Sequence, residues 1–508
     1  MSLTSLHVDV LFVIFDYLVL MFAEDVVKWP FRTKYLIPVS ETCRTLRTVA
    51  IPFLFREAYN WKRFETKVGQ CDESPVESVW PPSVGQFIRK LHVRDFDEGH
   101  KPIDMRALEL VLPKLPALNH IRFELIAPPP ADLISSAAAV STLDTIEFHK
   151  ARFDGPSLAP TFSRFSHLQS FAMSIGLSRT GNINLEQELE NIKGILSSIA
   201  GTLVELEISG DLVEMTTLST ISWPCLRKLV LTDHIPFGKT IPLTSMVGQM
   251  PCLRTLGLNF TAVVKWDLMP IIFCFDLDDV SSPPLSSVLP HLQVFSISNA
   301  LPEDPLFDQL PPNLEVLRVL ALRDHLPGYD YRQQQWYSYS TLNDTAAFRV
   351  IEIAGRLPLV ELALNLEKAP SPSILEAIAA SCPNLRVLEL EEWRHDIHHI
   401  EPQYPLASLI RPLLQLQHLR DLRLTLELGD QDDSGAHVWP FARTRLFSRM
   451  NAAAQEFAEG LPQLHYISFS YWNSSKYNGI LRNLIWYGYG IYRGKPGEPP
   501  FVKFLDFF

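Results

Sequence analysis

Apolar residues recur through most of the chain in one spaced pattern, apolar-x-x-apolar-x-apolar, between residues 88 and 469. The last two apolar positions alternate with polar ones, and alternation with period two is typical of a half-buried β-strand. The pattern occurs 13 times, about every 31 residues, and its middle positions are Leu91, Ile121, Ile146, Phe171, Leu206, Leu229, Leu256, Phe295, Leu317, Leu362, Leu388, Leu422 and Ile467. One copy would mean little, but thirteen in succession predict thirteen strands of a structural repeat.

Short stretches with helical spacing precede many of these strands, for example Ser373–Ser381 and Ala452–Glu459. Each ends at Gly or Pro just before the next strand, and those residues stop helices. Strand, turn and helix in repetition are typical of the leucine-rich repeat, in which each unit buries its apolar side only by stacking on its neighbours. The sequence therefore predicts an α/β leucine-rich-repeat solenoid, a horseshoe with one parallel sheet.

The first 56 residues do not follow the repeat. Apolar residues at 6, 10, 11, 14, 15 and 18 have helical spacing, and so do those at 39, 43, 46, 49 and 50, where Ser40 can cap the helix. Two or three short helices are too small to form an independent core. We expect this segment to need a partner.

The same segment resembles an F-box, whose pattern runs L-P-x-E-I-L-x-x-I-F-x-Y-L, then S-x-V-C-R-x-W-R-x-L-A, then P-x-L-W-R. The matching residues are Leu6, Asp9 (in place of Glu), Val10, Leu11, Ile14, Phe15, Tyr17, Leu18, Ser40, Cys43, Arg44, Arg47, Val49, Ala50, Pro52, Leu54, Phe55 and Arg56. The chain departs from the pattern at His7, where the family has Pro, at Leu46, where it has Trp, and in a long insertion over 19–39. With the repeats that follow, the layout is similar to the F-box-like leucine-rich-repeat proteins of fungi.

This resemblance implies that the N-terminal helices bind the adaptor subunit of an SCF-type ubiquitin ligase, and through it a cullin. The contact would place an apolar helical face in a groove of the adaptor. The residues expected to make it are Leu6, Val10, Leu11, Ile14, Phe15, Leu18, Cys43, Leu46, Pro52 and Leu54. A second interpretation stays open, because a solenoid needs a cap and these helices could serve only to seal the first repeat.

Composition narrows the classes of partner. The net charge of −12 argues against a broad nucleic-acid footprint and against electrostatic attachment to anionic membranes. The apolar run 8–22 is too short to span a bilayer and contains Asp9 and Asp16. No basic segment precedes it and no cleavage site follows it, so a signal peptide is disfavoured. Six cysteines without C-x-x-C spacing indicate a reducing compartment, and we expect a cytoplasmic or nuclear protein.

No catalytic or cofactor motif stands out. The segment Gly238-Lys239-Thr240 lacks the leading glycine of a phosphate-binding loop, because position 233 is Asp. The best metal candidate, His395 with His398, falls in an expected polar loop, so a solvated loop is the preferred interpretation. We therefore expect no enzyme, no cofactor and no metal.

Residues that alternate with the repeat leucines point away from the core. In the early strands these residues are basic to mixed in charge and include histidines, in the middle strands they are small, and in the later strands they are acidic. Such a surface suits a polypeptide partner better than a phosphate polymer. Loops at 328–345 and 429–447 bring Tyr and Trp, which dominate interface hot spots. The predicted substrate-binding residues are Arg318, Glu361, Glu389, Glu391, Arg423, Tyr331 and Trp336. The aromatic loops could equally fold back on the solenoid.

Four segments follow from these patterns: an F-box-like helical segment at 1–60, a linker at 61–85, the irregular solenoid at 86–470 and an aromatic-rich C-terminal cap at 471–508. The expected function is a non-catalytic substrate receptor of a ubiquitin ligase, with an unknown protein substrate and no nucleic-acid or membrane partner. The alternative is a repeat scaffold without a role in ubiquitin transfer. A binder of a single target, similar to an enzyme inhibitor, has no positive feature in the sequence.

Overall fold

The computed structural model describes residues 6–21, 36–59, 82–94, 105–125, 127–175, 183–236, 241–261, 283–301, 304–322, 341–392, 404–426, 440–474, 482–495 and 497–507. The chain divides into two compact units, residues 1–226 with 236–238 and residues 227–235 with 239–508. The division falls inside the predicted solenoid, and the four predicted segment boundaries stay predictions.

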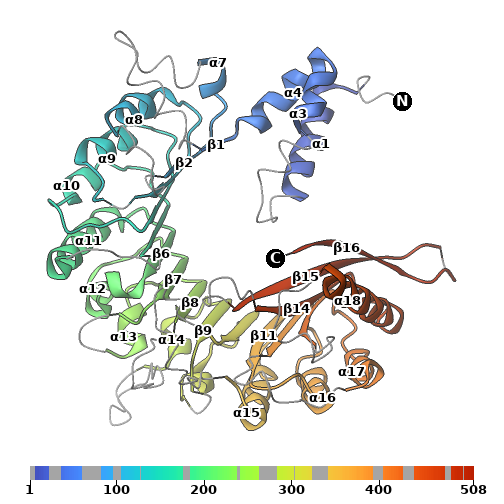
Figure 1. Ribbon diagram of the computed structural model, residues 1–508. Coiled ribbons are helices and arrows are strands. Elements are labelled where there is room, and N and C mark those ends of the chain that lie inside the picture. Colours follow the sequence, from blue (N-terminus) through green and yellow to red (C-terminus); the bar gives the residue numbers. More distant parts are fainter. Residues whose placement is uncertain are drawn as a thin grey trace. The chain divides into compact units, whose positions relative to one another are not determined.

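The first unit alternates helices with parallel strands (Figure 1). Its helices are α1 (Val8–Met21), α3 (Ile37–Thr42), α4 (Arg44–Leu54), α7 (Pro82–Gly85), α8 (Met105–Val111), η3 (Leu112–Lys114), α9 (Ala131–Ala138), α10 (Ala159–Phe162), α11 (Leu185–Ile199), η4 (Gly210–Leu212) and α12 (Met215–Thr220). Its strands are β1 (Glu57–Tyr59), β2 (Lys90–Arg94), β3 (His120–Glu124), β4 (Thr145–His149), β5 (Ser170–Ser174) and β6 (Glu205–Ser209). Each strand pairs in parallel with the next, from β1 to β6.

The second unit continues the alternation and ends differently. Its strands are β7 (Lys228–Asp233), β8 (Thr255–Phe260), β9 (Val294–Ser298), β10 (Val316–Leu320), β11 (Glu361–Leu366), β12 (Val387–Glu392), β13 (Asp421–Thr425), β14 (Tyr466–Ser474), β15 (Arg482–Tyr492) and β16 (Phe501–Phe507). Its helices are α13 (Leu243–Val247), α14 (Leu285–Val288), η5 (Phe307–Gln309), α15 (Asp344–Ala354), α16 (Pro372–Ser381), α17 (Leu406–Leu413) and α18 (Pro440–Gly460). Pairing is parallel from β7 to β14 and antiparallel from β14 through β15 to β16.

All thirteen predicted strands are present, as β2 to β14, and the repeat positions align within each unit. In the first unit Leu91, Ile121, Ile146, Phe171 and Leu206 pair in one row. In the second unit the row runs Leu229, Leu256, Phe295, Leu317, Leu362, Leu388, Leu422 and Ile467. All these side chains are fully buried. The period-two pattern thus forms a continuous apolar layer between strands and helices in each unit.

A backbone ladder marks the start of the repeat strands β2 to β6 and β8 to β14. The carbonyl just before one strand accepts two consecutive amides of the next repeat, at N···O distances of 2.7–3.1 Å. The acceptors in the first unit are Arg56, Arg89, Asn119, Asp144 and Gln169, and those in the second are Arg227, Arg254, Gln293, Glu315, Val360, Arg386 and Arg420. The first acceptor, Arg56, lies two residues after the end of α4. The N-terminal helices therefore enter the same hydrogen-bond ladder as the repeats.

The N-terminal helices differ from the prediction in one detail. Ser40 does not cap the second helix but is buried inside α3, where its hydroxyl donates to the carbonyl of Ile37. The chain breaks at Cys43, which is extended at φ −157°, and its sulfur accepts the amide of Leu46. The segment predicted as one helix thus forms two, because the side chain of Cys43 caps the start of a second helix.

The C-terminal hairpin packs on the last helix. Phe447 of α18 meets Tyr487 of β15 and Phe504 of β16 edge-on, with ring centroids 5.2 and 5.6 Å apart. Arg493 donates to the carbonyls of Leu464, Ala458 and Leu461, which satisfies the end of α18. Aromatic side chains therefore cover the last helix of the second unit.

Candidate functional site

The N-terminal helices form a small core of their own. Leu11 and Phe15 of α1 pack in one cluster with Leu36, which precedes α3, and with Leu46, Val49, Ala50 and Phe53 of α4. The ring of Phe53 lies 6.0 Å from that of Phe12 and 5.8 Å from that of Phe15. This packing holds α1 against α4.

The ten predicted adaptor-binding residues separate by exposure. Leu11, Phe15 and Leu46 lie in the interior, so they hold the helices together rather than face a partner. Leu6, Ile14, Cys43, Pro52 and Leu54 are partly buried, Val10 is 45% exposed, and the side chain of Leu18 lies outside the described residues. Whether these residues bind an adaptor stays a prediction.

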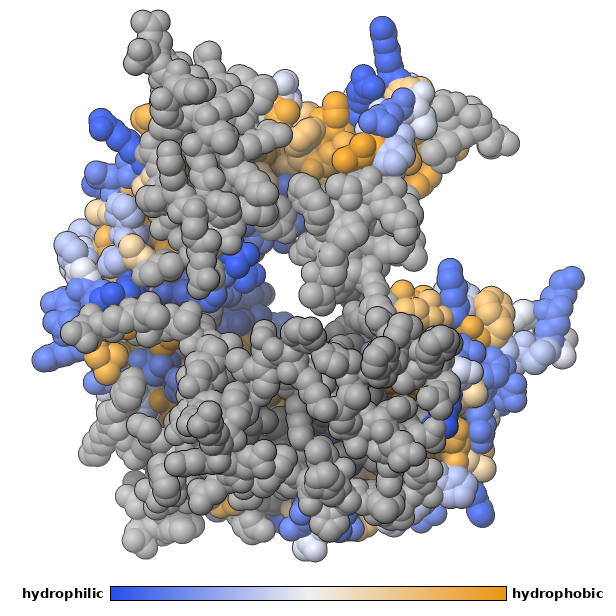
Figure 2. All heavy atoms as spheres, in the orientation of Figure 1, coloured by the Kyte–Doolittle hydropathy of each residue, from blue (hydrophilic) through white to orange (hydrophobic). Residues whose placement is uncertain are grey.

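One face of α1 is apolar and uncovered in the part of the chain that the structure describes. Val13 is 68% exposed and Val10 is 45% exposed. The two are three residues apart and therefore share a helix face, opposite the one that carries Leu11 and Phe15. Figure 2 shows apolar residues gathered at the surface over α1 and α4. Val13 was missed from the sequence because the F-box pattern has no apolar position there, although its spacing from Val10 could have indicated it.

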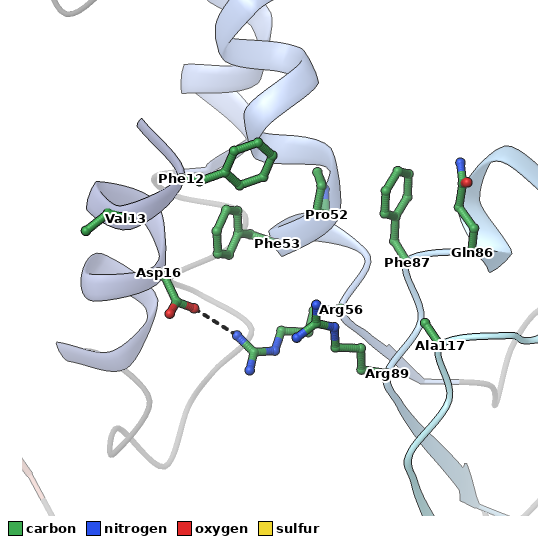
Figure 3. Close-up of a pocket in the computed structure, with 10 residues that line it drawn as sticks. All are labelled: Phe12, Val13, Asp16, Pro52, Phe53, Arg56, Gln86, Phe87, Arg89 and Ala117. Carbon is green, nitrogen blue, oxygen red and sulfur yellow. Dashed lines mark hydrogen bonds and ion pairs between the residues drawn. The ribbon is translucent and has the colours of Figure 1, made fainter. Parts of the chain in front are cut away.

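A pocket of about 360 Å³ lies between these helices and the first repeats, and we call it the aromatic–arginine pocket (Figure 3). It is lined by Phe12, Val13 and Asp16 of α1, by Pro52, Phe53 and Arg56 at the end of α4, and by Gln86, Phe87, Arg89 and Ala117 of the first two repeats. Sequence reasoning did not identify it, because its walls lie far apart along the chain.

The strands of the first unit carry the predicted imidazoles, and these surround one carboxylate. Glu147 of β4 contacts Nε2 of His120 at 3.2 Å and Nε2 of His149 at 3.4 Å. Burial alone would raise the pKa of Glu147, but hydrogen bonds with His120 and His149 hold it well below its usual range. Nearby, burial lowers the pKa of His92 to about 4. This surface therefore presents a fixed anion, Glu147, held between the imidazoles of His120 and His149.

The predicted substrate-binding residues of the second unit do lie on neighbouring strands, but they bind one another. Arg318 contacts Glu361 at 2.6 Å, and Arg423 contacts Glu389 at 3.1 Å. Arg423 also reaches Asp421 at 3.0 Å. Parallel register places these pairs side by side across β10 to β13. Both guanidinium groups are therefore already neutralised within the chain.

Glu391 is the exception in this group, because no arginine pairs with it among the described contacts. Burial, reinforced by the neighbouring carboxylate of Glu389, raises the pKa of Glu391 to about 8, and a hydrogen bond with Asn365 only partly offsets this. Burial also raises the pKa of Glu389, which Arg423 opposes. The remaining predicted residues, Tyr331 and Trp336, lie outside the described residues.

The described residues contain no group of His, Cys, Asp and Glu able to hold a metal ion. His395 and His398 lie outside those residues. Among the helices that the structure describes, none is long and apolar enough to cross a membrane.

No protein-family model matches the chain, and no curated protein matches it. Among solved structures, it is similar to a chain in the crystal structure of the TLR13–ssRNA13 complex, with 16% identity and a TM-score of 0.35 over 69% of this chain and 42% of that one. The Rad7 and Elc1 complex in yeast gives 13% identity and a TM-score of 0.36, over 74% of this chain and 92% of that one. The circular LRR protein CroV588 has 12% identity and a TM-score of 0.21, over 70% of this chain and 43% of that one. All three TM-scores lie below 0.5, and these likenesses assign neither a partner nor an activity to the chain.

Proposed function

We propose that the chain is a non-catalytic substrate receptor of an SCF-type ubiquitin ligase, similar to the F-box-like leucine-rich-repeat proteins of fungi. In this proposal α1, α3 and α4 bind the adaptor, which links the chain to a cullin, and the repeat strands bind a protein substrate. In this proposal the protein acts in the cytoplasm or nucleus and needs no cofactor. The horseshoe curvature of the repeats stays a prediction.

The exposed apolar face of α1 is the observation that carries the proposal. A cap that only seals the first repeat would turn its apolar side chains toward that repeat. Here Leu11 and Phe15 already complete the core of the helices, yet Val10 and Val13 remain exposed on the opposite face, with Val13 also lining the aromatic–arginine pocket beside the first repeats. Apolar groups left at such a helix face are typical of a helix that docks in a groove.

The attachment of these helices also fits a receptor. The chain passes from α4 directly into β1, which pairs with β2, and the carbonyl of Arg56 accepts the amides of Arg89 and Lys90 at 2.8 and 2.9 Å. An adaptor bound to α1 would thus be joined to the first repeat through α4 and the paired strand β1. Such a junction suits a protein that must hold a substrate at a set distance from a catalytic partner.

Substitution of Val13 by Asp tests this function. We expect V13D to reduce capture of purified SCF adaptor by the full chain at least tenfold, because docking would bury an unpaired carboxylate. A tenfold loss corresponds to about 1.4 kcal/mol. Binding is measured by calorimetry with wild-type chain, V13D and the control L110D, which alters an apolar residue of α8 that is 49% exposed.

Thermal unfolding should be unchanged in both variants, since both positions face solvent. If the wild-type chain does not bind the adaptor, the proposed function is wrong and the alternative, a repeat scaffold without a ubiquitin role, is favoured. Equal binding by V13D and the wild type would remove α1 as the docking element.

A further inference from the structure

The aromatic–arginine pocket has an apolar wall that solvent can reach. Phe12 and Phe53 stand on one side and Phe87 on the other, with Pro52 between them (Figure 3). Phe12, Pro52 and Phe87 are partly exposed. A space of about 360 Å³ between these walls is large enough for one aromatic or branched aliphatic side chain with its neighbouring backbone.

The opposite end of the pocket carries an excess of positive charge. Arg56 and Arg89 extend toward the same region, and Arg56 contacts Asp16 at 3.1 Å (Figure 3). Among the described residues no carboxylate pairs with the guanidinium of Arg89, which is exposed. The pocket thus holds two cations and one anion, in a chain whose net charge is −12.

Backbone hydrogen bonds fix the two arginines relative to each other. The carbonyl of Arg56 accepts the amide of Arg89, so the two residues occupy adjacent rungs of the ladder. A guanidinium binds a carboxylate through two parallel hydrogen bonds, and such pairs are about twice as strong as neutral ones. Arg89 is therefore placed to receive a carboxylate beside the aromatic wall.

From this charge complementarity we infer that the aromatic–arginine pocket binds a short segment of a partner polypeptide in which an aromatic or aliphatic side chain adjoins a carboxylate. The apolar side chain lies between Phe53 and Phe87, and the carboxylate pairs with Arg89 and competes with Asp16 for Arg56. One surplus cation suits a single carboxylate, whereas a nucleic acid would need a wider basic surface. This inference does not depend on adaptor binding by α1.

The test uses three fluorescein-labelled peptides with the full chain. The first is Ser-Gly-Glu-Phe-Glu-Gly-Ser. The second has Gln in place of both Glu residues, and the third has Ala in place of Phe. Fluorescence anisotropy should show that the first peptide binds at least tenfold more tightly than either analogue. If the acidic peptide does not bind at concentrations up to about 1 mM, the weak end of specific recognition, the inference is overturned.

Two substitutions with opposite expected effects on affinity make the test specific. R89E should weaken binding of the acidic peptide at least tenfold, through like-charge repulsion. Asp16→Asn should strengthen binding of that peptide severalfold, because it frees Arg56. Damage to the fold cannot produce such a gain in affinity. The control R106E reverses an exposed charge on α8, away from the pocket, and should leave binding unchanged.

Other occupants give different results. If inorganic phosphate displaces the peptide and the Ala analogue binds as tightly as the Phe peptide, the pocket is a simple anion site and the inference fails. If D16N does not strengthen binding, the carboxylate does not compete with Asp16 for Arg56, and the inferred binding mode is overturned. Because the peptide assay contains no adaptor, failure here is distinguishable from failure of the adaptor interaction.

Discussion

Glu391 shows how one position on a repeat strand can oppose folding. Its pKa is about 8 against an ordinary value of 4.5, so the folded chain keeps a proton that the unfolded chain releases between those values. Stability therefore falls as pH rises through this window, and the full penalty is present above pH 8.

Replacement of Glu391 by Gln should remove this penalty. We expect E391Q to be more stable than the wild type at pH 9 by roughly 2–5 kcal/mol, because each unit by which burial raises the pKa costs about 1.4 kcal/mol once the carboxyl ionises. The two proteins should converge below about pH 4, where the carboxyl is largely protonated in both the folded and the unfolded chain. Urea unfolding at several pH values measures this, and an E391Q that is no more stable at pH 9 would contradict the assigned environment.

At the scale of single elements, helix α11 fastens a loop through polar side chains. Asn191 is buried and donates to the carbonyls of Phe153 and Gly155 at 2.6 and 2.7 Å, and the carboxylate of Glu188 accepts the amide of Phe153 at 2.8 Å. The loop after β4 has no strand partner for these groups. The helix therefore supplies the hydrogen bonds that a sheet would otherwise provide.

Asn191→Ala should cost roughly 2–4 kcal/mol of unfolding free energy, because it leaves the buried carbonyl of Phe153 and the partly buried carbonyl of Gly155 without this donor. The neighbouring Glu190 is exposed, so E190A should change stability by about 0.5 kcal/mol or less. Chemical unfolding of both variants measures the difference. A loss in N191A no greater than in E190A would mean that water replaces the missing amide.

Elements differ in how well the sequence predicts them. The strands β2 to β14 follow from period-two spacing alone, and helices such as α16 follow from their apolar face and the stops at their ends. Strand β1 was not predicted, because three residues carry no readable period and only pairing with β2 fixes them. The C-terminal segment was predicted as an aromatic cap, but its antiparallel direction depends on how the chain turns between β14 and β15.

The candidate site was harder to predict than the fold. Arg56 and Arg89 come together only because β1 pairs with β2. Likewise, the second unit brings Arg318 and Glu361 onto adjacent strands as a pair, whereas the sequence alone indicated two separate charges. Periodicity reports which face a side chain occupies, and it does not report which distant side chain lies next to it.

On the scale of the whole molecule, stability in a stacked array is a sum over neighbouring repeats. Leu229 of β7 is fully buried in the apolar row of the second unit, with Leu256 beside it. We expect L229A to lower the unfolding free energy of that unit by about 2–5 kcal/mol. The control is L414A, at a position that is 44% exposed. Denaturant unfolding compares them, and a cost below about 1 kcal/mol would show that the row collapses around the gap.

The backbone ladder also restricts where the chain can place proline. Each rung needs two consecutive amide hydrogens, so proline, which has none, is excluded from both positions. None of the 39 prolines stands on a described rung, yet Pro116, Pro224, Pro251, Pro290, Pro312, Pro383 and Pro462 each lie two residues before the first apolar position of a repeat. Proline is thus accepted three residues before the first amide of a rung and should disrupt the repeat at the rung itself. The irregular repeats therefore share a backbone constraint that their side chains do not reveal.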